Sequence, residues 1–179
     1  MFRIALIYGA IAGSVVIGAM TLGIVLDGDE KGAASGQLFG YLIMLVALTL
    51  IFVGVKRHRD VNHGGVIAFL PALFTGLSIA AVAGVFYVIG WEIYLAATDH
   101  AFIDDYTAAI LAKKQAAGVT GADLEALAAE MNKMAENYRN PLFRVPITFS
   151  EIFPVGLLVA VVSAALLRNP KILPAHGKA

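Results

Sequence analysis

Four long runs of apolar residues, separated by short polar stretches, dominate the hydrophobic pattern of the chain. They cover approximately residues 4–26, 38–55, 66–94 and 145–167. A hydrocarbon core about 30 Å thick needs about 20 apolar residues in a helix, because each residue rises about 1.5 Å. All four runs approach or exceed that length, and they lack the strict alternation of barrel strands. The pattern predicts an all-α, polytopic membrane protein with four transmembrane helices in a single membrane domain, residues 1–179.

The composition agrees with this prediction. The chain is 59% hydrophobic and 15% charged, whereas a soluble domain has about 45–50% apolar and about 25% charged residues. The sequence contains no cysteine, which excludes disulfides and thiol chemistry. The first apolar run is longer than the core of a signal peptide and no A-x-A-like site follows it, so we expect it to be retained.

The charges between the runs predict the orientation, because Lys and Arg accumulate in cytoplasmic loops. One predicted side carries the basic residues Arg3, Lys56, Arg57, Arg59, Arg168, Lys171 and Lys178, with Asp60 among them. The other side is acidic on balance and carries Asp27, Asp29, Glu30, Asp99, Asp104, Asp105, Asp123, Glu125, Glu130 and Glu136, with Lys31, Lys113, Lys114, Lys133 and Arg139. We therefore predict that both termini and the 56–65 loop are cytoplasmic.

Residues 96–140, between the third and fourth runs, form the longest polar segment and are predicted to be an extracytoplasmic helical hairpin. Two groups of apolar residues recur at helical spacing, from Phe102 to Leu111 and from Leu124 to Tyr138. Gly118–Gly121 separates them, and Thr120 with Asp123 resembles a capping box. A cover over the outer end of the bundle is the simplest interpretation, and a surface for a partner protein is the alternative.

Small residues recur four positions apart in every run. They are Gly9, Gly13 and Gly18 with Ser14, then Gly36 and Gly40, then Gly76, Ala80 and Gly84, then Ala160 and Ala164. Lipid gives helices no hydrophobic reason to associate, so close backbone approach and dispersion contacts must hold them. We interpret these positions as contacts within one compact bundle, with a homo-oligomer interface as the alternative.

Polar residues inside or beside the third and fourth runs form a predicted outer-leaflet cluster. Its members are Glu92, Arg144, Thr148, Ser150 and Glu151. A charged group at the centre of a membrane helix costs about 2.5–3.5 kcal/mol on insertion scales and usually faces protein or water. The cluster is interpreted as a structural ion pair of Arg144 with Glu92 or Glu151. The alternatives are a proton- or ion-linked pocket, or a Glu151 that lies nearer the interface.

The four histidines are His58, His63, His100 and His176. The spacing of His58 and His63, which are placed in one loop, matches no common pattern of metal ligands. We interpret them as interfacial loop residues and predict no metal site.

The junction between the second and third runs has a structural interpretation of its own. Anionic cytoplasmic lipids would attract each of Lys56, Arg57 and Arg59 with a free energy of about 1 kcal/mol. Asp60 is expected to pair with one of them or to cap the turn, and Gly64 and Gly65 permit a tight, left-handed turn. A topology anchor followed by a turn is therefore predicted, with a lipid-headgroup or protein-docking site as the alternative.

The same junction, Gly54-Val55-Lys56-Arg57-His58-Arg59-Asp60 followed by Gly64-Gly65 and Phe69, resembles the G-x-K-x-x-R-D and G-G-x-x-x-F pattern of the domain of unknown function family 4199. The Pro141-Leu142-Phe143 start of the last run is similar to that family too. The resemblance implies a four-helix protein of the bacterial inner membrane and implies no activity.

The functional classes follow from these residues. No phosphate-binding glycine loop, nucleophile–base pair or metal constellation indicates an enzyme, and no basic face favours nucleic acid. No cofactor is expected. The expected partners are the lipid bilayer and either another membrane protein or further copies of this chain. We favour a non-catalytic accessory, scaffold or assembly component, and the alternative is a small oligomeric transporter or channel that uses a site around Glu151.

Overall fold

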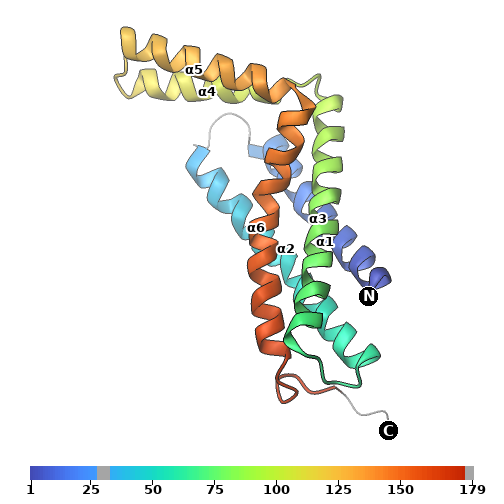
Figure 1. Ribbon diagram of the computed structural model, residues 1–179. Helices are drawn as coiled ribbons and strands as arrows, with labels where there is room; N and C mark the ends of the chain where they lie inside the picture. The colour runs from blue at the N-terminus through green and yellow to red at the C-terminus, as the bar shows by residue number, and fades with distance from the viewer. Residues whose placement is uncertain (28–32, 176–179) are drawn as a thin grey trace. The chain divides into compact units, whose positions relative to one another are not determined.

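The computed structural model describes residues 1–27 and 33–175, with side chains described for residues 1–24 and 40–175. These residues are helical apart from short connections, and they contain no strand (Figure 1). The helices are α1 Phe2–Asp27, α2 Ala33–Asn62, α3 Phe69–Ala97, α4 Phe102–Ala116, α5 Ala122–Arg139 and α6 Pro141–Leu167. The predicted charges at Asp29, Glu30, Lys31 and Lys178, and the residue His176, lie outside the described residues.

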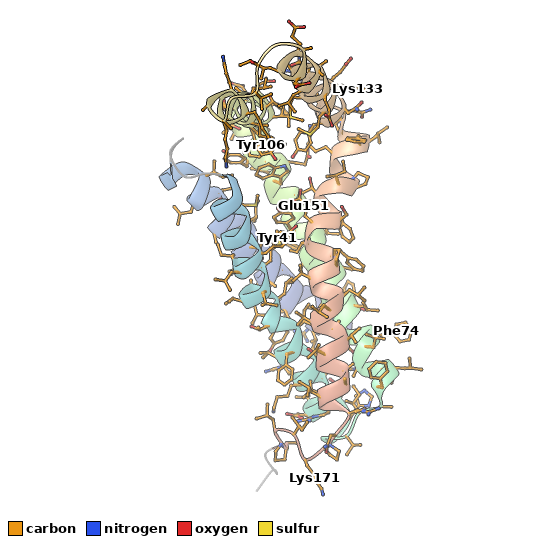
Figure 2. All side chains as sticks on the ribbon, turned by 90° about the vertical axis from the view of Figure 1, so that its left-hand side faces the viewer. Tyr41, Phe74, Tyr106, Lys133, Glu151 and Lys171 are labelled. Atoms are coloured by element: carbon orange, nitrogen blue, oxygen red, sulfur yellow. The ribbon has the colours of Figure 1, made fainter. Side chains whose placement is uncertain are left out.

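Four of these helices are long and apolar enough to cross a membrane, as the sequence predicted. The spans are Phe2–Ile24, Gly40–Asn62, Phe69–Ala97 and Pro141–Leu167. Large apolar side chains on them stand away from the ribbon, for example Tyr41 at 47% and Phe74 at 59% exposure (Figure 2). Such exposure fits helices whose outer faces contact lipid, because burial in lipid replaces burial in a protein core.

Several predicted boundaries differ from the observed helix ends by three residues or more. Helix α2 continues beyond Val55 to Asn62, because its polar end still forms favourable pairs one turn apart, such as Lys56 with Asp60. Helix α3 begins at Phe69 rather than near Val66, after Gly64 and Gly65, whose φ angles are 60° and 90°.

Helix α6 begins at Pro141 rather than near Val145. Proline suits the first helical position because its missing N–H would be unpaired there in any case. The side-chain oxygen of Asn140 accepts a hydrogen bond from the Leu142 N–H at 3.0 Å, as a helix-capping residue does. The fourth span therefore starts immediately after the hairpin.

The chain forms two compact units. The bundle unit consists of residues 1–90 and 149–179 and contains α1, α2 and most of α3 and α6. The hairpin unit consists of residues 91–148 and contains α4, α5, the end of α3 and the start of α6. The sequence predicted one membrane domain, and each unit is described by itself below.

Within the bundle unit, glycines and alanines bring the helices together. A Cβ atom added at Gly76 would lie 2.8 Å from the Cβ of Ala160, and one added at Gly156 would lie 2.8 Å from the Cβ of Ala80. One added at Gly9 would lie 2.7 Å from the carbonyl oxygen of Ile79. These separations are shorter than van der Waals contact, so the helix pairs need the small residues. The predicted packing within the bundle is confirmed at these positions.

Other predicted small positions have no such neighbour. A Cβ added at Gly18 or Gly40 would meet nothing within 4 Å among the described atoms. Gly36 lies in the stretch whose side-chain surroundings are not described.

Within the hairpin unit, α4 and α5 lie side by side (Figure 1). The predicted break is confirmed at Gly118 and Gly121, which have φ angles of 91° and 61°. The predicted capping box at Thr120 is wrong, because Gly121 is the residue that precedes α5 and no side chain caps that helix. The positive φ that the chain needs there favours glycine.

Candidate functional site

Arg144 and Glu92 form a two-pronged ion pair in the hairpin unit. Nε of Arg144 donates to Oε1 of Glu92 at 2.8 Å, and Nη2 donates to Oε2 at 2.6 Å. The Arg144 side chain is 3% exposed and the Glu92 side chain is 31% exposed. The planar guanidinium matches the carboxylate with two parallel hydrogen bonds, which is the strongest geometry for such a pair. The predicted ion pair is thus confirmed with Glu92 as the partner.

The third guanidinium nitrogen of Arg144, Nη1, binds the end of α5. Nη1 donates to the carbonyl oxygen of Tyr138 at 3.0 Å and to that of Arg139 at 3.4 Å. The last carbonyls of a helix have no partner within the helix, and a cationic side chain satisfies them well. Arg144 therefore joins three segments of the unit: the end of α3, the end of α5 and the start of α6.

Aromatic side chains surround this ion pair. Nε1 of Trp91 donates to the hydroxyl of Tyr138 at 2.7 Å, and the Trp91 ring stacks on Tyr94 with centroids 5.2 Å apart. Phe102 of α4 meets Trp91 edge-on at 4.8 Å. These contacts leave Trp91 2% exposed. Trp91 connects α3 to both helices of the hairpin.

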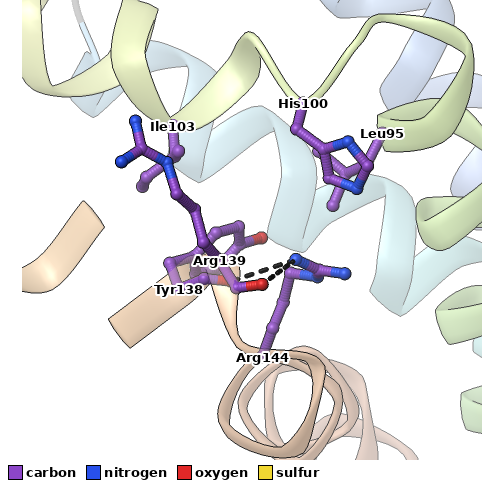
Figure 3. A pocket seen from close by; sticks show the side chains of 6 residues that line it. All are labelled: Leu95, His100, Ile103, Tyr138, Arg139 and Arg144. Atoms are coloured by element: carbon purple, nitrogen blue, oxygen red, sulfur yellow. Dashed lines mark hydrogen bonds between the residues drawn. The ribbon is translucent and has the colours of Figure 1, made fainter. Parts of the chain in front are cut away.

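A small cavity of about 10 Å³ lies beside Arg144 (Figure 3). It is lined by Leu95, His100, Ile103, Tyr138, Arg139 and Arg144. Ligand pockets usually measure about 300–1,000 Å³. Together with the four hydrogen bonds of the guanidinium, this small volume indicates an anchor for the hairpin rather than a ligand site.

Glu151 lies in the bundle unit, on an exposed position of α6 within the fourth span. Its Oε2 atom is 3.1 Å from the hydroxyl of Tyr87 on α3. Tyr87 is fully buried, and its hydroxyl is also 3.1 Å from Sδ of Met20 on α1. Figure 2 labels Glu151 on the α6 ribbon. The predicted neighbour Thr148 is 2% exposed and belongs to the hairpin unit.

The Tyr87 hydroxyl lies at hydrogen-bond distance from both Glu151 Oε2 and Met20 Sδ. Within the bundle unit, Tyr87 therefore links α3 to α6 and to α1.

At the other predicted site, Arg59 turns into the protein. It is 0% exposed, and its Nη1 and Nη2 atoms donate to the carbonyl oxygens of Ile172 and Leu173 at 2.9 and 2.5 Å. Its Nε atom donates to Asp60 at 2.7 Å, and Lys56 donates to the other Asp60 oxygen at 2.5 Å. The predicted pairing of Asp60 is confirmed. Arg59 holds the segment after α6 against the end of α2.

The two glycines of the junction have different surroundings. A Cβ added at Gly65 would lie 3.0 Å from the Cβ of Ala175, so the small residue admits the segment that Arg59 holds. Gly64 has open space around it, and its φ of 60° favours glycine. Arg57 is exposed.

The sequence predicted that the two histidines of the junction share a loop, and this prediction is wrong. His58 lies within α2 and is 7% exposed, whereas His63 follows the helix and is exposed. The Nε2 atoms of the two rings are 3.2 Å apart. The prediction failed because it ended the second helix at Val55, seven residues before its end.

Sequence reasoning also missed Tyr87, Tyr138 and the carbonyl contacts of Arg59. The apolar pattern does not distinguish a buried tyrosine from its neighbours in a span. Contacts with backbone carbonyls depend on no residue type and so cannot be predicted from the sequence. A signal did exist for Tyr138, since an arginine three residues after Asn140-Pro141 is well placed to cap the preceding helix.

The fold defines the chain as an α-helical protein with four helices of membrane-spanning length and composition. Among the side chains described, those of residues 1–24 and 40–175, no three His, Asp or Glu residues converge as metal ligands.

The chain belongs to the family described as "Protein of unknown function (DUF4199)", whose sequence profile matches residues 7–169. The predicted resemblance is thereby confirmed. No curated protein and no solved structure matches the chain.

Proposed function

We propose that this protein is a non-catalytic accessory, scaffold or assembly component of the bacterial inner membrane, and that it binds a partner through the α4–α5 hairpin. In this proposal both termini and the junction at Lys56–Asp60 are cytoplasmic, and the hairpin is extracytoplasmic. The basic residues beside the spans and the acidic excess in the hairpin favour this orientation.

The ion pair at the base of the hairpin is the observation that carries the proposal. Arg144 is nearly inaccessible, and its hydrogen bonds go to Glu92 and to the last carbonyls of α5. A flexible connection between two spans needs no such anchor, because exposed loops tolerate mobility at little cost. Fixing both helices of a hairpin at its base is useful when its surface must be presented in a fixed conformation to another protein.

The surface of the hairpin carries aromatic and charged side chains that suit such contact. Tyr106 is 41% exposed on α4 and stacks on Phe102 with ring centroids 6.0 Å apart. Lys113 and Lys114 end α4, and acidic residues begin both helices. Exposed tyrosines held by a neighbour lose little side-chain freedom on binding and are frequent at interfaces.

The contact between Arg59 and Ile172–Leu173 supports the proposed topology. It places the end of α2 and the segment after α6 at the same end of the bundle unit. Two further spans, α3 and α6, separate those segments along the chain, so a common side of the membrane is required.

Purification from native membranes in a mild detergent tests the function. We expect a second protein in fixed ratio with this chain, and loss of that protein in a Tyr106→Ala variant. Leu158→Ala is the matched control, since Leu158 is 60% exposed on α6 of the bundle unit. Recovery of the chain alone, or equal retention of the second protein by both variants, would contradict the proposal.

A small oligomeric transporter or channel is the second proposal, and the exposed carboxyl group of Glu151 favours it. Ionisable side chains within spans commonly belong to proton or ion pathways. In vesicles with an imposed proton gradient, this proposal expects flux in the unmodified protein and its loss in Glu151→Gln. The variant must still insert and fold. A flux unchanged by the substitution would exclude this role.

A further inference from the structure

The side chains of His58 and His63 meet at the end of α2, next to the buried Arg59. Their Nε2 atoms are 3.2 Å apart and the ring centroids are 4.8 Å apart at an angle of 83°. Two imidazole nitrogens bound to one tetrahedral metal ion lie about 3.3–3.4 Å apart, given metal–nitrogen bonds of about 2.0–2.1 Å. The observed separation therefore matches that of a pair of metal ligands.

The second nitrogen of His58 is held by Asn62. Nδ1 of His58 and Oδ1 of Asn62 are 3.1 Å apart. The amide oxygen is an acceptor, so Nδ1 carries the proton and Nε2 keeps its lone pair. Histidines that bind metals usually donate their other N–H to such an oxygen, which fixes the tautomer and the ring orientation. His58 thus has both the free nitrogen and the supporting contact of a metal ligand.

Access to the pair is one-sided. His58 is 7% exposed, whereas His63 is exposed. An ion can approach from the His63 side and bind to a His58 ring that is already held in place. Asp60, paired with Lys56 and Arg59, offsets part of the positive charge nearby.

We propose that His58 and His63 form a binding site for a divalent transition-metal ion at the junction between α2 and α3. Imidazole nitrogens favour zinc, copper and nickel over magnesium and calcium. Water molecules or a lipid phosphate complete the coordination. For a given set of nitrogen ligands Cu²⁺ binds more tightly than Zn²⁺ or Ni²⁺, so the same order is expected here.

A proton shared by the two rings is the competing explanation for the short separation. In that case His63 donates an Nε2–H to His58 Nε2, and neither Nε2 atom has a free lone pair for an ion. The two explanations differ in what they predict on addition of metal, so a binding measurement separates them.

The test uses the full chain, purified in detergent without a polyhistidine tag and titrated with Zn²⁺ by calorimetry. We expect one ion per chain. His63→Ala should weaken binding at least tenfold, because one of two protein ligands is lost. Asn62→Ala should weaken it about tenfold, as for the loss of a supporting contact to a ligand. His63 is exposed, so its replacement leaves the packing intact. Cu²⁺ bound to the unmodified chain should show hyperfine coupling to two nitrogens by electron paramagnetic resonance.

His100→Ala is the matched control. His100 is exposed in the hairpin unit, so this substitution removes an imidazole from another part of the chain. Zn²⁺ affinity should survive it. Equal affinity of His63→Ala and the unmodified chain would overturn the proposal. So would a loss of binding confined to His100→Ala, which would assign the metal to other residues.

Discussion

In the bundle unit the helices meet at Gly9, Gly76 and Gly156, whereas in the hairpin unit the contacts converge on Arg144. Lipid on the outside of a bundle removes the hydrophobic reason for helices to associate, so that unit relies on close backbone approach. At the hairpin, helix ends leave carbonyl groups unpaired, and a buried cation can satisfy several of them together. Small side chains thus hold one unit, and one large charged side chain holds the other.

Removing Arg144 should have the largest effect. In Arg144→Ala, Glu92 and the α5 carbonyls lose their partner, and breaking a buried ion pair in this way costs about 3–5 kcal/mol. The half-buried Glu92 favours the lower end of that range. Limited proteolysis of the hairpin and thermal unfolding in detergent would measure the loss. Arg144→Lys keeps the charge but not the two-pronged geometry, so it should be intermediate. Unchanged protease resistance in Arg144→Ala would show that the anchor does not hold the hairpin.

Adding a methyl group at Gly76 should have the next largest effect. In Gly76→Ala the new Cβ would lie 2.8 Å from Ala160 Cβ, and overpacking of this kind costs about 1–3 kcal/mol. Gly18→Ala is the matched control, since no described atom lies within 4 Å of a Cβ there, and alanine in place of glycine stabilises a helix by about 1 kcal/mol. Opposite shifts in unfolding temperature are expected. A loss of similar size in Gly18→Ala would instead place that face of α1 in an interface between copies.

Replacing Glu151 should have the smallest effect on stability. Glu151→Gln keeps an acceptor for the Tyr87 hydroxyl, so the change should stay below about 1 kcal/mol. Glu92→Gln removes the charge that Arg144 requires and should cost about 3 kcal/mol. Thermal unfolding of the two variants compares the same substitution in the two units. A larger loss in Glu151→Gln than in Glu92→Gln would mean that Glu151 is ionised and paired.

The spans could be predicted because hydropathy over about 20 residues depends on no tertiary detail. The Arg144–Glu92 pair was also within reach, because two opposite charges in adjacent spans require compensation. The helix boundaries were harder to predict. Helix α2 continues through Lys56–Asn62 because polar residues can extend a helix once it leaves the lipid. The ring separation of His58 and His63 depends on how the chain turns after α2, and no five-residue spacing encodes that turn.

The opposite location of the junction and the hairpin is the claim on which the proposed function rests most directly. The chain has no cysteine, so single cysteines can be placed at the exposed positions Arg57 and Lys113 without background labelling. In sealed vesicles of known orientation, a membrane-impermeant maleimide should label Lys113→Cys from the extracytoplasmic side. It should reach Arg57→Cys from that side only after the membrane is permeabilised. Labelling of both positions from the same side of sealed vesicles would contradict the account.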